Sequence, residues 1–203
     1  MGFGSYHTAW EWLHRMRQAM VLPRRNKLNG EVEIHETFIG GVKPGKRGRG
    51  AAGKTLVLIA AEVRGRAIGR IRLQVIPDAT ADTLLDQVDL LVERGSNVVT
   101  DGLASYSALT GRGFDHTVAR HMPEVGLNLL PKAHRVASLL KRWMLGTHQG
   151  AIGKQHLQPY LDEFVFRFNR RASGSRGLLF YRLLQQAVAH GPIPKDKLTF
   201  SPG

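Results

Sequence analysis

The chain of 203 residues contains no cysteine, which excludes disulfide bonds, thiolate metal sites and cysteine-based zinc ribbons. It also has no uninterrupted apolar run long enough to span a membrane, and its first residues lack the basic start and apolar segment of a signal peptide. Acidic residues are scarce, 16 against 29 lysines and arginines, so the net charge is +13 and the pI is near 10.7. We therefore expect a protein of the cytoplasm or its nucleoid, without membrane contact. The charge favours a polyanionic partner, most simply nucleic acid, although non-specific contact would satisfy it too.

At this length the chain forms one domain, or one domain with a small appendage. We expect a helical N-terminal segment over residues 1–29, a main domain over 30–190 and a tail over 191–203. A capping box at residues 8–11 opens the first helix, and Pro23 ends it. Its apolar residues recur at helical spacing: Trp10, Leu13, Met16 and Met20. Such a helix either docks on the main core or is the remnant of a DNA-binding arm.

Residues 32–41 read Val-Glu-Ile-His-Glu-Thr-Phe-Ile-Gly-Gly and predict a β-strand that ends at two glycines. Alternation places Glu33 and His35 on one face and Glu36 on the opposite face, unless a bulge intervenes. Burial of these groups would be costly unless they were paired or bound a metal. The plainer interpretation is an edge strand with a solvated outer face.

A second acidic signal lies at residues 97–102, Asn-Val-Val-Thr-Asp-Gly. A short apolar strand ends there at Asp101, a position where α/β sheets often carry chemistry, although an Asp-Gly turn without function fits as well. Residues 103–109 then predict the start of a helix. The other expected elements are a hairpin of residues 56–63 and 67–76, a helix at 79–93 capped by Asp78, a strand at 114–119, and helices at 130–143, 157–169 and 178–188. This order alone predicts an α/β or α+β protein.

Taken together, these stretches resemble the DDE transposases of bacterial insertion sequences, in the group with the ISXO2-like domain. Residues 32–41 are similar to the opening motif V-E-x-D-E-[TS]-[FY]-x-G-G of that family, and residues 98–102 to its second acidic motif. Residues 130–143 and 160–171 are similar to its third motif and its tail. The resemblance covers nearly the whole chain. It implies an α/β fold, an RNase-H-like mixed sheet with flanking helices and with helical N- and C-terminal extensions.

The resemblance also implies a catalytic site and a reaction. Transposases of this fold cut DNA with water and then use the freed 3′-hydroxyl to attack target DNA, with Mg²⁺ or Mn²⁺ as cofactor, and they act as multimers, so we expect a homo-oligomer. Asp101 takes the second acidic position, His134 the third position and Lys141 the basic position seven residues later. His35 stands where the family has its first Asp. We expect Asp101 and His35 to bind metal and the activity to be impaired, because imidazole suits Mn²⁺ better than Mg²⁺. By themselves, His134 also fits a helix start and Lys141 a solvated helix face.

Basic residues give candidate DNA contacts on a Gly-rich loop and on two helices: Lys46, Arg47, Arg49, Lys54, Arg142, Arg167, Arg170 and Arg171. The same loop, Gly48–Thr55, satisfies the P-loop pattern G-x-x-x-x-G-K-[ST], but the run after it is strand-like, where a P-loop opens a helix. Two alternative functions therefore stay open. One is a P-loop NTPase, and the other is a DNA-binding relative that has lost catalysis.

Overall fold

The computed structural model describes residues 4–22, 25–40, 54–119, 129–148, 152–175, 177–194 and 198. Contacts group the chain into two compact units, residues 27–154 on the one hand and residues 1–26 with 155–203 on the other. The domain limits expected after residues 29 and 190 remain a prediction.

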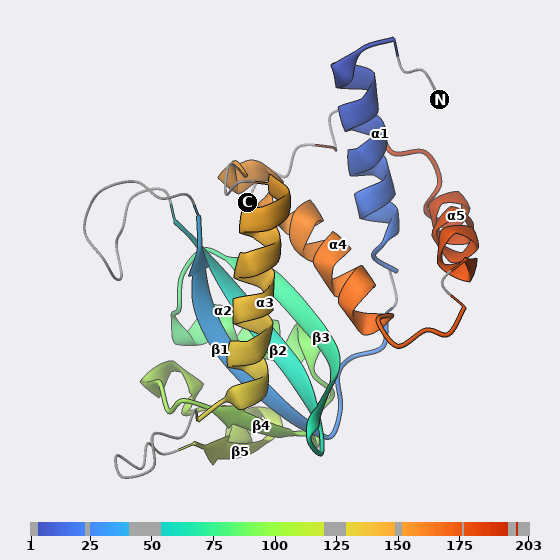
Figure 1. Cartoon of the computed structure of the whole chain (residues 1–203). Helices are drawn as coiled ribbons and strands as arrows, with labels where there is room; N and C mark the ends of the chain where they lie inside the picture. The colour runs from blue at the N-terminus through green and yellow to red at the C-terminus, as the bar shows by residue number, and fades with distance from the viewer. Residues whose placement is uncertain are drawn as a thin grey trace. The chain divides into compact units, whose positions relative to one another are not determined.

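A five-stranded mixed sheet forms the centre of the unit 27–154 (Figure 1). Its strands are β1 (Glu31–Ile39), β2 (Thr55–Arg64), β3 (Ala67–Ile76), β4 (Asn97–Thr100) and β5 (Asp115–Val118). In space they follow the order β3-β2-β1-β4-β5. The first three are antiparallel neighbours, whereas β4 runs parallel to β1 and β5 parallel to β4. This confirms the mixed RNase-H-like sheet that the motifs imply.

The expected hairpin is confirmed, with β2 and β3 joined by a tight turn at Gly65 and Arg66. Gly65 has a φ of 56°, a left-handed conformation that glycine adopts at little cost. The strands are rich in β-branched residues, and Val57, Ile59 and Ile71 are fully buried.

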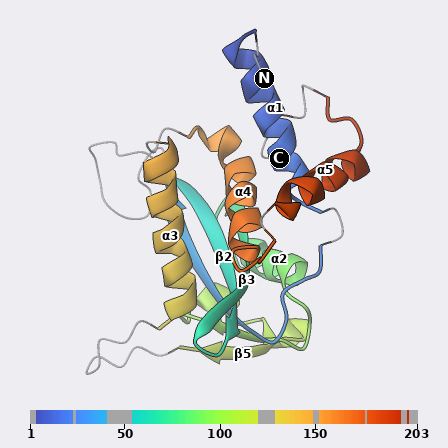
Figure 2. The same ribbon diagram turned by 45° about the vertical axis from the view of Figure 1, so that its right-hand side comes forward.

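Two helices cover opposite faces of this sheet, α2 (Ala81–Leu91) and α3 (Pro131–His148) (Figures 1 and 2). As expected, α2 buries one apolar face: Leu84, Leu85, Val88 and Leu91. That face packs with Val32 and Ile34 of β1 in one core cluster. On α3 the buried residues are Ala133, Val136, Ala137, Leu140 and Met144, so Leu139 and Trp143 of the expected stripe are only partly buried.

Two local predictions in this unit are wrong. Thr80, not Asp78, is the N-cap residue of α2. Asp78 lies two residues too early and instead accepts a hydrogen bond from the Thr80 backbone N–H at 3.0 Å. The segment after Asp101 forms two short 3₁₀ turns, η1 (Ala104–Tyr106) and η2 (Thr110–Arg112), in place of a regular helix. Gly111 lies within η2 and Gly113 ends it, and glycine disfavours a longer helix.

The second unit contains the helices α1 (Tyr6–Ala19), α4 (Leu157–Asn169) and α5 (Leu178–His190), with a 3₁₀ turn, η3 (Lys154–His156), at the boundary before α4. Helix α1 begins after Ser5, whose hydroxyl accepts a hydrogen bond from the Thr8 N–H at 3.2 Å, so the expected capping box lies three residues too late. In the described ranges no helix combines the length and hydrophobicity that crossing a membrane requires.

The apolar stripe expected for α1 is also wrong. Its buried residues are His14, Arg17 and Ala19, whereas Leu13 is 55% exposed. The reason is polar packing: the Arg17 guanidinium donates to the Glu163 carboxylate of α4 at 2.8 Å, and this pair occupies the place of apolar contacts.

Candidate functional site

The position of Asp101 is set by the end of β4 and by the turn that follows it. Its Oδ1 accepts a hydrogen bond from the Leu103 N–H at 3.2 Å, which fixes the carboxylate across the turn. Gly102 has a φ of +85°, and a Cβ added there would lie 2.7 Å from Cγ1 of Val118. The Asp-Gly pair is therefore a structural requirement of the turn that presents Asp101.

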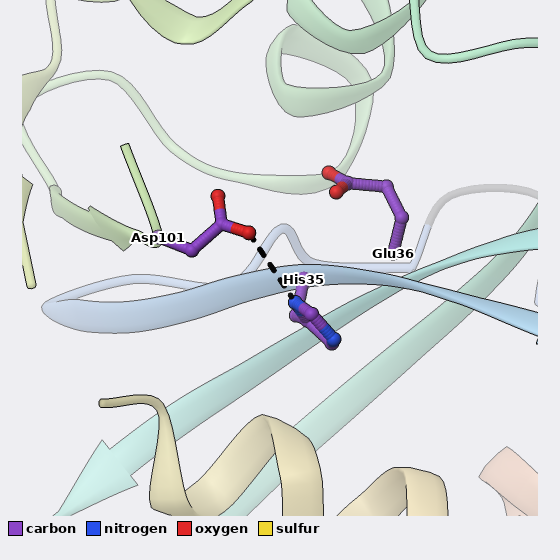
Figure 3. A group of neighbouring side chains, drawn as sticks. All are labelled: His35, Glu36 and Asp101. Atoms are coloured by element: carbon purple, nitrogen blue, oxygen red, sulfur yellow. Dashed lines mark ion pairs between the residues drawn. The ribbon is translucent and has the colours of Figure 1, made fainter. Parts of the chain in front are cut away.

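His35 lies on the neighbouring strand β1 and faces Asp101. The ladder between β1 and β4 runs from the pair Glu31–Asn97 to the pair Glu33–Val99, so beyond it the edge of β1 is free for the residue after β4. His35 Nδ1 and Asp101 Oδ2 are 3.9 Å apart (Figure 3). This nitrogen is buried and has no hydrogen-bond partner among the described residues.

The electrostatic surroundings keep the His35 ring neutral at neutral pH. Burial lowers the pKa of His35 most, the nearby His134 and Lys141 lower it further, and Asp101 only partly opposes them. A neutral imidazole offers a nitrogen lone pair, the form in which histidine binds metals.

Glu36 lies close to this pair. From the sequence we expected it to reach His35 only if a bulge interrupted the strand. The pairing of β1 with β2 is continuous through His35 and Glu36, so the strand has no bulge here and the two side chains do leave opposite faces. Nevertheless, His35, Glu36 and Asp101 each offer a ligand atom, and these atoms lie within 4.8 Å of one another. Figure 3 shows Asp101 beside the edge of the β1 ribbon, with His35 and Glu36 on its two sides. Because β4 stops before Asp101, that carboxylate is within reach of both faces.

The carboxylate of Glu36 is oriented by Tyr106 of η1, whose hydroxyl donates a hydrogen bond to Glu36 Oε1. The Tyr106 side chain is fully buried. The sequence signal for Glu36 was its position directly after His35. That Glu36 belongs to the cluster, however, is shown only by the place where β4 ends.

Glu33, the other acidic residue considered for the site, has a different role. Its Oε2 accepts hydrogen bonds from the backbone N–H groups of Lys132 and Ala133, at 2.7 and 2.8 Å, at the start of α3. Burial raises the pKa of Glu33, and these hydrogen bonds only partly compensate. Glu33 thus attaches β1 to the N-terminus of α3, where unpaired N–H groups need an acceptor.

That attachment places His134 of α3 against His35. Their ring centroids are 4.5 Å apart, with an interplanar angle of 68°. One end of the cluster is therefore covered by a second imidazole. Further along α3, partial desolvation lowers the pKa of Lys141, and the neighbouring Lys54 lowers it again, so two lysines lie close together near the site.

Only some of the expected DNA-contact residues lie within the described part of the chain. Lys46, Arg47 and Arg49 lie outside the described residues, whereas Lys54 and Arg142 are exposed. Lys54 is followed directly by strand β2. A nucleotide-binding P-loop needs a helix at this point, so the structure argues against that assignment for Gly48–Thr55.

Arg167 of α4 and the two arginines that follow its end, Arg170 and Arg171, belong to the other unit and contact side chains of α4. Arg167 pairs with Glu163 at 2.8 Å, and the guanidinium groups of Arg170 and Arg171 lie 3.9 and 4.0 Å from the ring centroids of Phe166 and Phe168. Their contact with DNA remains a prediction.

Comparisons with known proteins give matches of two kinds. Among solved structures, the chain is similar to "Mos1 transposase paired-end complex with left transposon end", with 16% identity and a TM-score of 0.46, covering 88% of this chain and 62% of that one. It is also similar to "Crystal structure of a pre-cleavage Mos1 transpososome", with 15% identity and a TM-score of 0.46, covering 91% and 64%. The chain thus spans less than two thirds of these chains. Among curated proteins, no match was found.

The family comparison is decisive. The model of the ISXO2-like transposase domain matches residues 27–169, which include all five strands, α2, α3 and α4. The match confirms the resemblance that the acidic motifs around His35 and Asp101 indicate. The chain therefore belongs to the family of proteins with an ISXO2-like transposase domain.

Proposed function

We propose that this chain acts in DNA transposition, binding DNA and cutting and joining its strands at the site around His35 and Asp101. The observation that carries the proposal is the approach of these two residues, whose side chains are 3.9 Å apart, with His35 on β1 and Asp101 directly after the adjacent parallel strand β4 of a transposase-family domain. Domain limits at residues 30 and 190 form part of the same proposal.

The residues present suit a divalent metal ion. Two carboxylates and a neutral imidazole nitrogen, from Asp101, Glu36 and His35, converge within 4.8 Å. Such an ion, when bound, would stabilise charge on the attacking and leaving oxygens of a phosphodiester. The carboxylates suit Mg²⁺ or Mn²⁺, but the imidazole of His35 is a poor ligand for Mg²⁺. We therefore expect impaired activity with Mg²⁺ and partial rescue by Mn²⁺.

The protein's own groups have distinct tasks in this proposal. Asp101 stays in place through its turn, and His134 packs against the ring of His35. Lys141 and Lys54 supply positive charge beside the cluster, where the phosphate of a DNA strand would lie. The surplus of +13 supports binding to the DNA backbone in general. With chromosomal DNA as substrate, we expect the protein to act at the nucleoid, as a homo-oligomer in keeping with the family.

The test is a strand-cleavage assay of the wild-type chain and a His35→Asp variant, on DNA that carries the ends of the element. We expect His35→Asp to raise the Mg²⁺-dependent rate by about tenfold or more, since about 1.4 kcal/mol of transition-state stabilisation is tenfold in rate. Asp101→Asn in the His35→Asp background is the matched control, and it should abolish cleavage while DNA binding persists. Strong Mg²⁺ activity of the wild type, without gain in His35→Asp, would contradict the proposal that position 35 is a damaged metal ligand.

A second candidate function is DNA binding without catalysis, favoured by the same replacement of the first Asp by His35. Such a protein would bind DNA with ordinary salt dependence, yet cleave it with neither Mg²⁺ nor Mn²⁺. Its His35→Asp variant would also be inactive in cleavage, because other catalytic residues would no longer function. The same assay therefore separates the two functions.

A further inference from the structure

Helix α5 turns apolar side chains to solvent, where a surface helix normally has charged ones. Among its residues only Gln186 is buried, whereas Phe180 is 60%, Tyr181 63% and Val188 83% exposed. Arg182 is the one lysine, arginine or acidic residue of this helix. An exposed apolar face of this kind marks a site of interaction with another molecule.

The side chains along this face change from large to small. At 3.6 residues per turn, Phe180, Leu184, Ala187 and Gly191 fall on one side of the helix, because they follow the spacing i, i+4, i+7 and i+11. The large end carries two aromatic rings, since the ring centroid of Tyr181 lies 6.2 Å from that of Phe180. At the small end, a Cβ added to Gly191 would project into open space.

The small end of the face borders a groove between α1 and α5, with a volume of about 260 Å³. Its lining includes Trp12, Met16, Ala19, Ala187 and Gly191. A cavity of about 150 Å³ is enough to hold a benzene molecule, so this groove has room for one aromatic ring. Arg15 of the lining is already engaged, because its guanidinium donates to the Ile193 carbonyl at 3.2 Å and to Glu11 at 3.4 Å. The groove therefore suits an apolar guest better than an anion.

A second copy of the chain carries a ring that fits this groove. In an antiparallel pair of α5 helices with a two-fold axis near Leu184, Phe180 of each copy lies opposite Ala187 and Val188 of the other, because Leu184 is about midway between them. Each large end then packs on the small end of the other copy, with the ring in the groove. This is the self-complementary patch that a two-fold interface requires.

The charge distribution favours the same occupant. Two copies with a net charge of +13 repel each other over most of their surface, so contact costs least at a face that is nearly uncharged. The charge of Arg182 lies about 160° around the helix from Leu184 and stays outside the contact. DNA, by contrast, would need basic side chains along the face.

We infer that the apolar face of α5, with the groove beside it, is the interface of a homodimer in which Phe180 of each copy fills the groove of the other. The inference goes beyond the proposed function, which names no surface for assembly, and α5 lies outside the residues 27–169 that the family model matches. With 13 residues the helix is about 20 Å long. Such a contact is at the small end of specific interfaces, so we expect a dissociation constant in the micromolar range.

The first test is sedimentation velocity of the full chain, freed of nucleic acid, over about 1–200 µM. The wild type should pass from monomer to dimer, and Phe180→Ala should weaken the dimer by about tenfold or more. Leu13→Ala, which removes an exposed apolar side chain of α1 outside the groove lining, is the matched control and should dimerise as the wild type does. Added salt should strengthen the dimer, because it screens the repulsion between two basic chains, whereas it weakens an association bridged by DNA.

The second test uses single cysteines, because the chain has none of its own. Leu184→Cys places a thiol near the two-fold axis and should give a disulfide-linked dimer under mild oxidation. Arg182→Cys, at an exposed position on the opposite side of the same helix, is the matched control and should stay largely unlinked.

Three results would overturn the inference. They are a chain that stays monomeric over the whole range, which would mean that another part of the chain covers the face, a Phe180→Ala dimer as tight as that of the wild type, and equal crosslinking at positions 182 and 184. A dimer that survives Phe180→Ala would refute this interface and leave the expected homo-oligomer intact. DNA cleavage plays no part in these measurements, so their failure and that of the proposed function are distinguishable.

Discussion

Two titratable groups of the helical unit, His14 and the partly buried Asp162, should have opposite effects on stability in acid, and one substitution at each position can reveal its effect. His14 of α1 is fully buried, and neither ring nitrogen has a hydrogen-bond partner among the described residues. Burial, with the positive charges of Arg17 and His156, lowers the pKa of His14 to about 4. Below pH 6.5 the unfolded chain therefore takes up a proton that the folded chain refuses, so stability falls as the pH falls. Between pH 6.5 and 4 the loss reaches about 3 kcal/mol, at about 1.4 kcal/mol per pH unit.

Asp162 of α4 has the opposite effect. Burial raises the pKa of this carboxyl from 3.8 to about 6, and Arg25 and Gln158 oppose the rise only in part. The folded chain thus keeps a proton that the unfolded chain releases, and the stability present below pH 3.8 is lost as the pH rises through 6. The side chain is only partly buried, so we expect about 2 kcal/mol from this group. In the wild type the two effects largely cancel between pH 4 and 6.

The assay is urea unfolding at pH 4, 5, 6 and 7, followed by far-UV circular dichroism, for the wild type, His14→Phe, Asp162→Asn and the double variant. Relative to the wild type, His14→Phe should gain stability toward pH 4, by about 3 kcal/mol, and Asp162→Asn should lose about 2 kcal/mol over the same range. The effects should add in the double variant, while all other groups titrate alike in the four proteins. If His14→Phe followed the pH profile of the wild type, the low pKa of His14 and the reasoning from its burial would be refuted.

Two further predictions follow from the turn after β4 and from the basic loop. Gly102→Ala should destabilise the protein by about 2 kcal/mol or more in urea unfolding, because φ is +85° and the new Cβ meets Val118; Val118→Ala in the same chain should restore only the steric part. Replacement of Lys46, Arg47 and Arg49 together by Ala should weaken binding to all DNA sequences alike and flatten its salt dependence by about one slope unit per lost contact. An unchanged salt slope would show that this loop does not contact DNA.

Those parts of the fold that depend on local chemistry could be predicted from the sequence. Alternation identifies β1, a β-branched apolar run identifies β2, the apolar spacing identifies α2, and an Asp-Gly pair after a short strand identifies the turn at Asp101. The buried face of α1 could not be found in this way. Arg17 is buried because Glu163 pairs with it from a helix far along the chain, and no local pattern reports a partner at that distance.

The same limit of prediction from sequence applies at the site, to Glu33, His35 and Glu36 of β1. Alternation correctly separates Glu36 from His35, but the assignment of Glu36 depends on where β4 stops, which is a property of the sheet. Glu33 has the right face for the cluster and is nevertheless excluded from it, because the N-terminus of α3 docks on its carboxylate. Which acidic residue becomes a ligand is thus decided by tertiary contacts that the strand sequence does not contain.

His35, which stands where the resemblance places the family's first Asp, is not independent of His134. Their ring centroids are 4.5 Å apart, so the His35 ring lies on the side of β1 that faces α3. A carboxylate at position 35 would face the imidazole of His134 and could pair with it. That pairing would compete with metal binding by the carboxylate. With an imidazole at position 35 this competition disappears, and His134 helps to lower the pKa of the His35 ring. His134 therefore helps to keep a nitrogen lone pair of His35 available beside Asp101, and imidazole nitrogen is a better ligand for Mn²⁺ than for Mg²⁺.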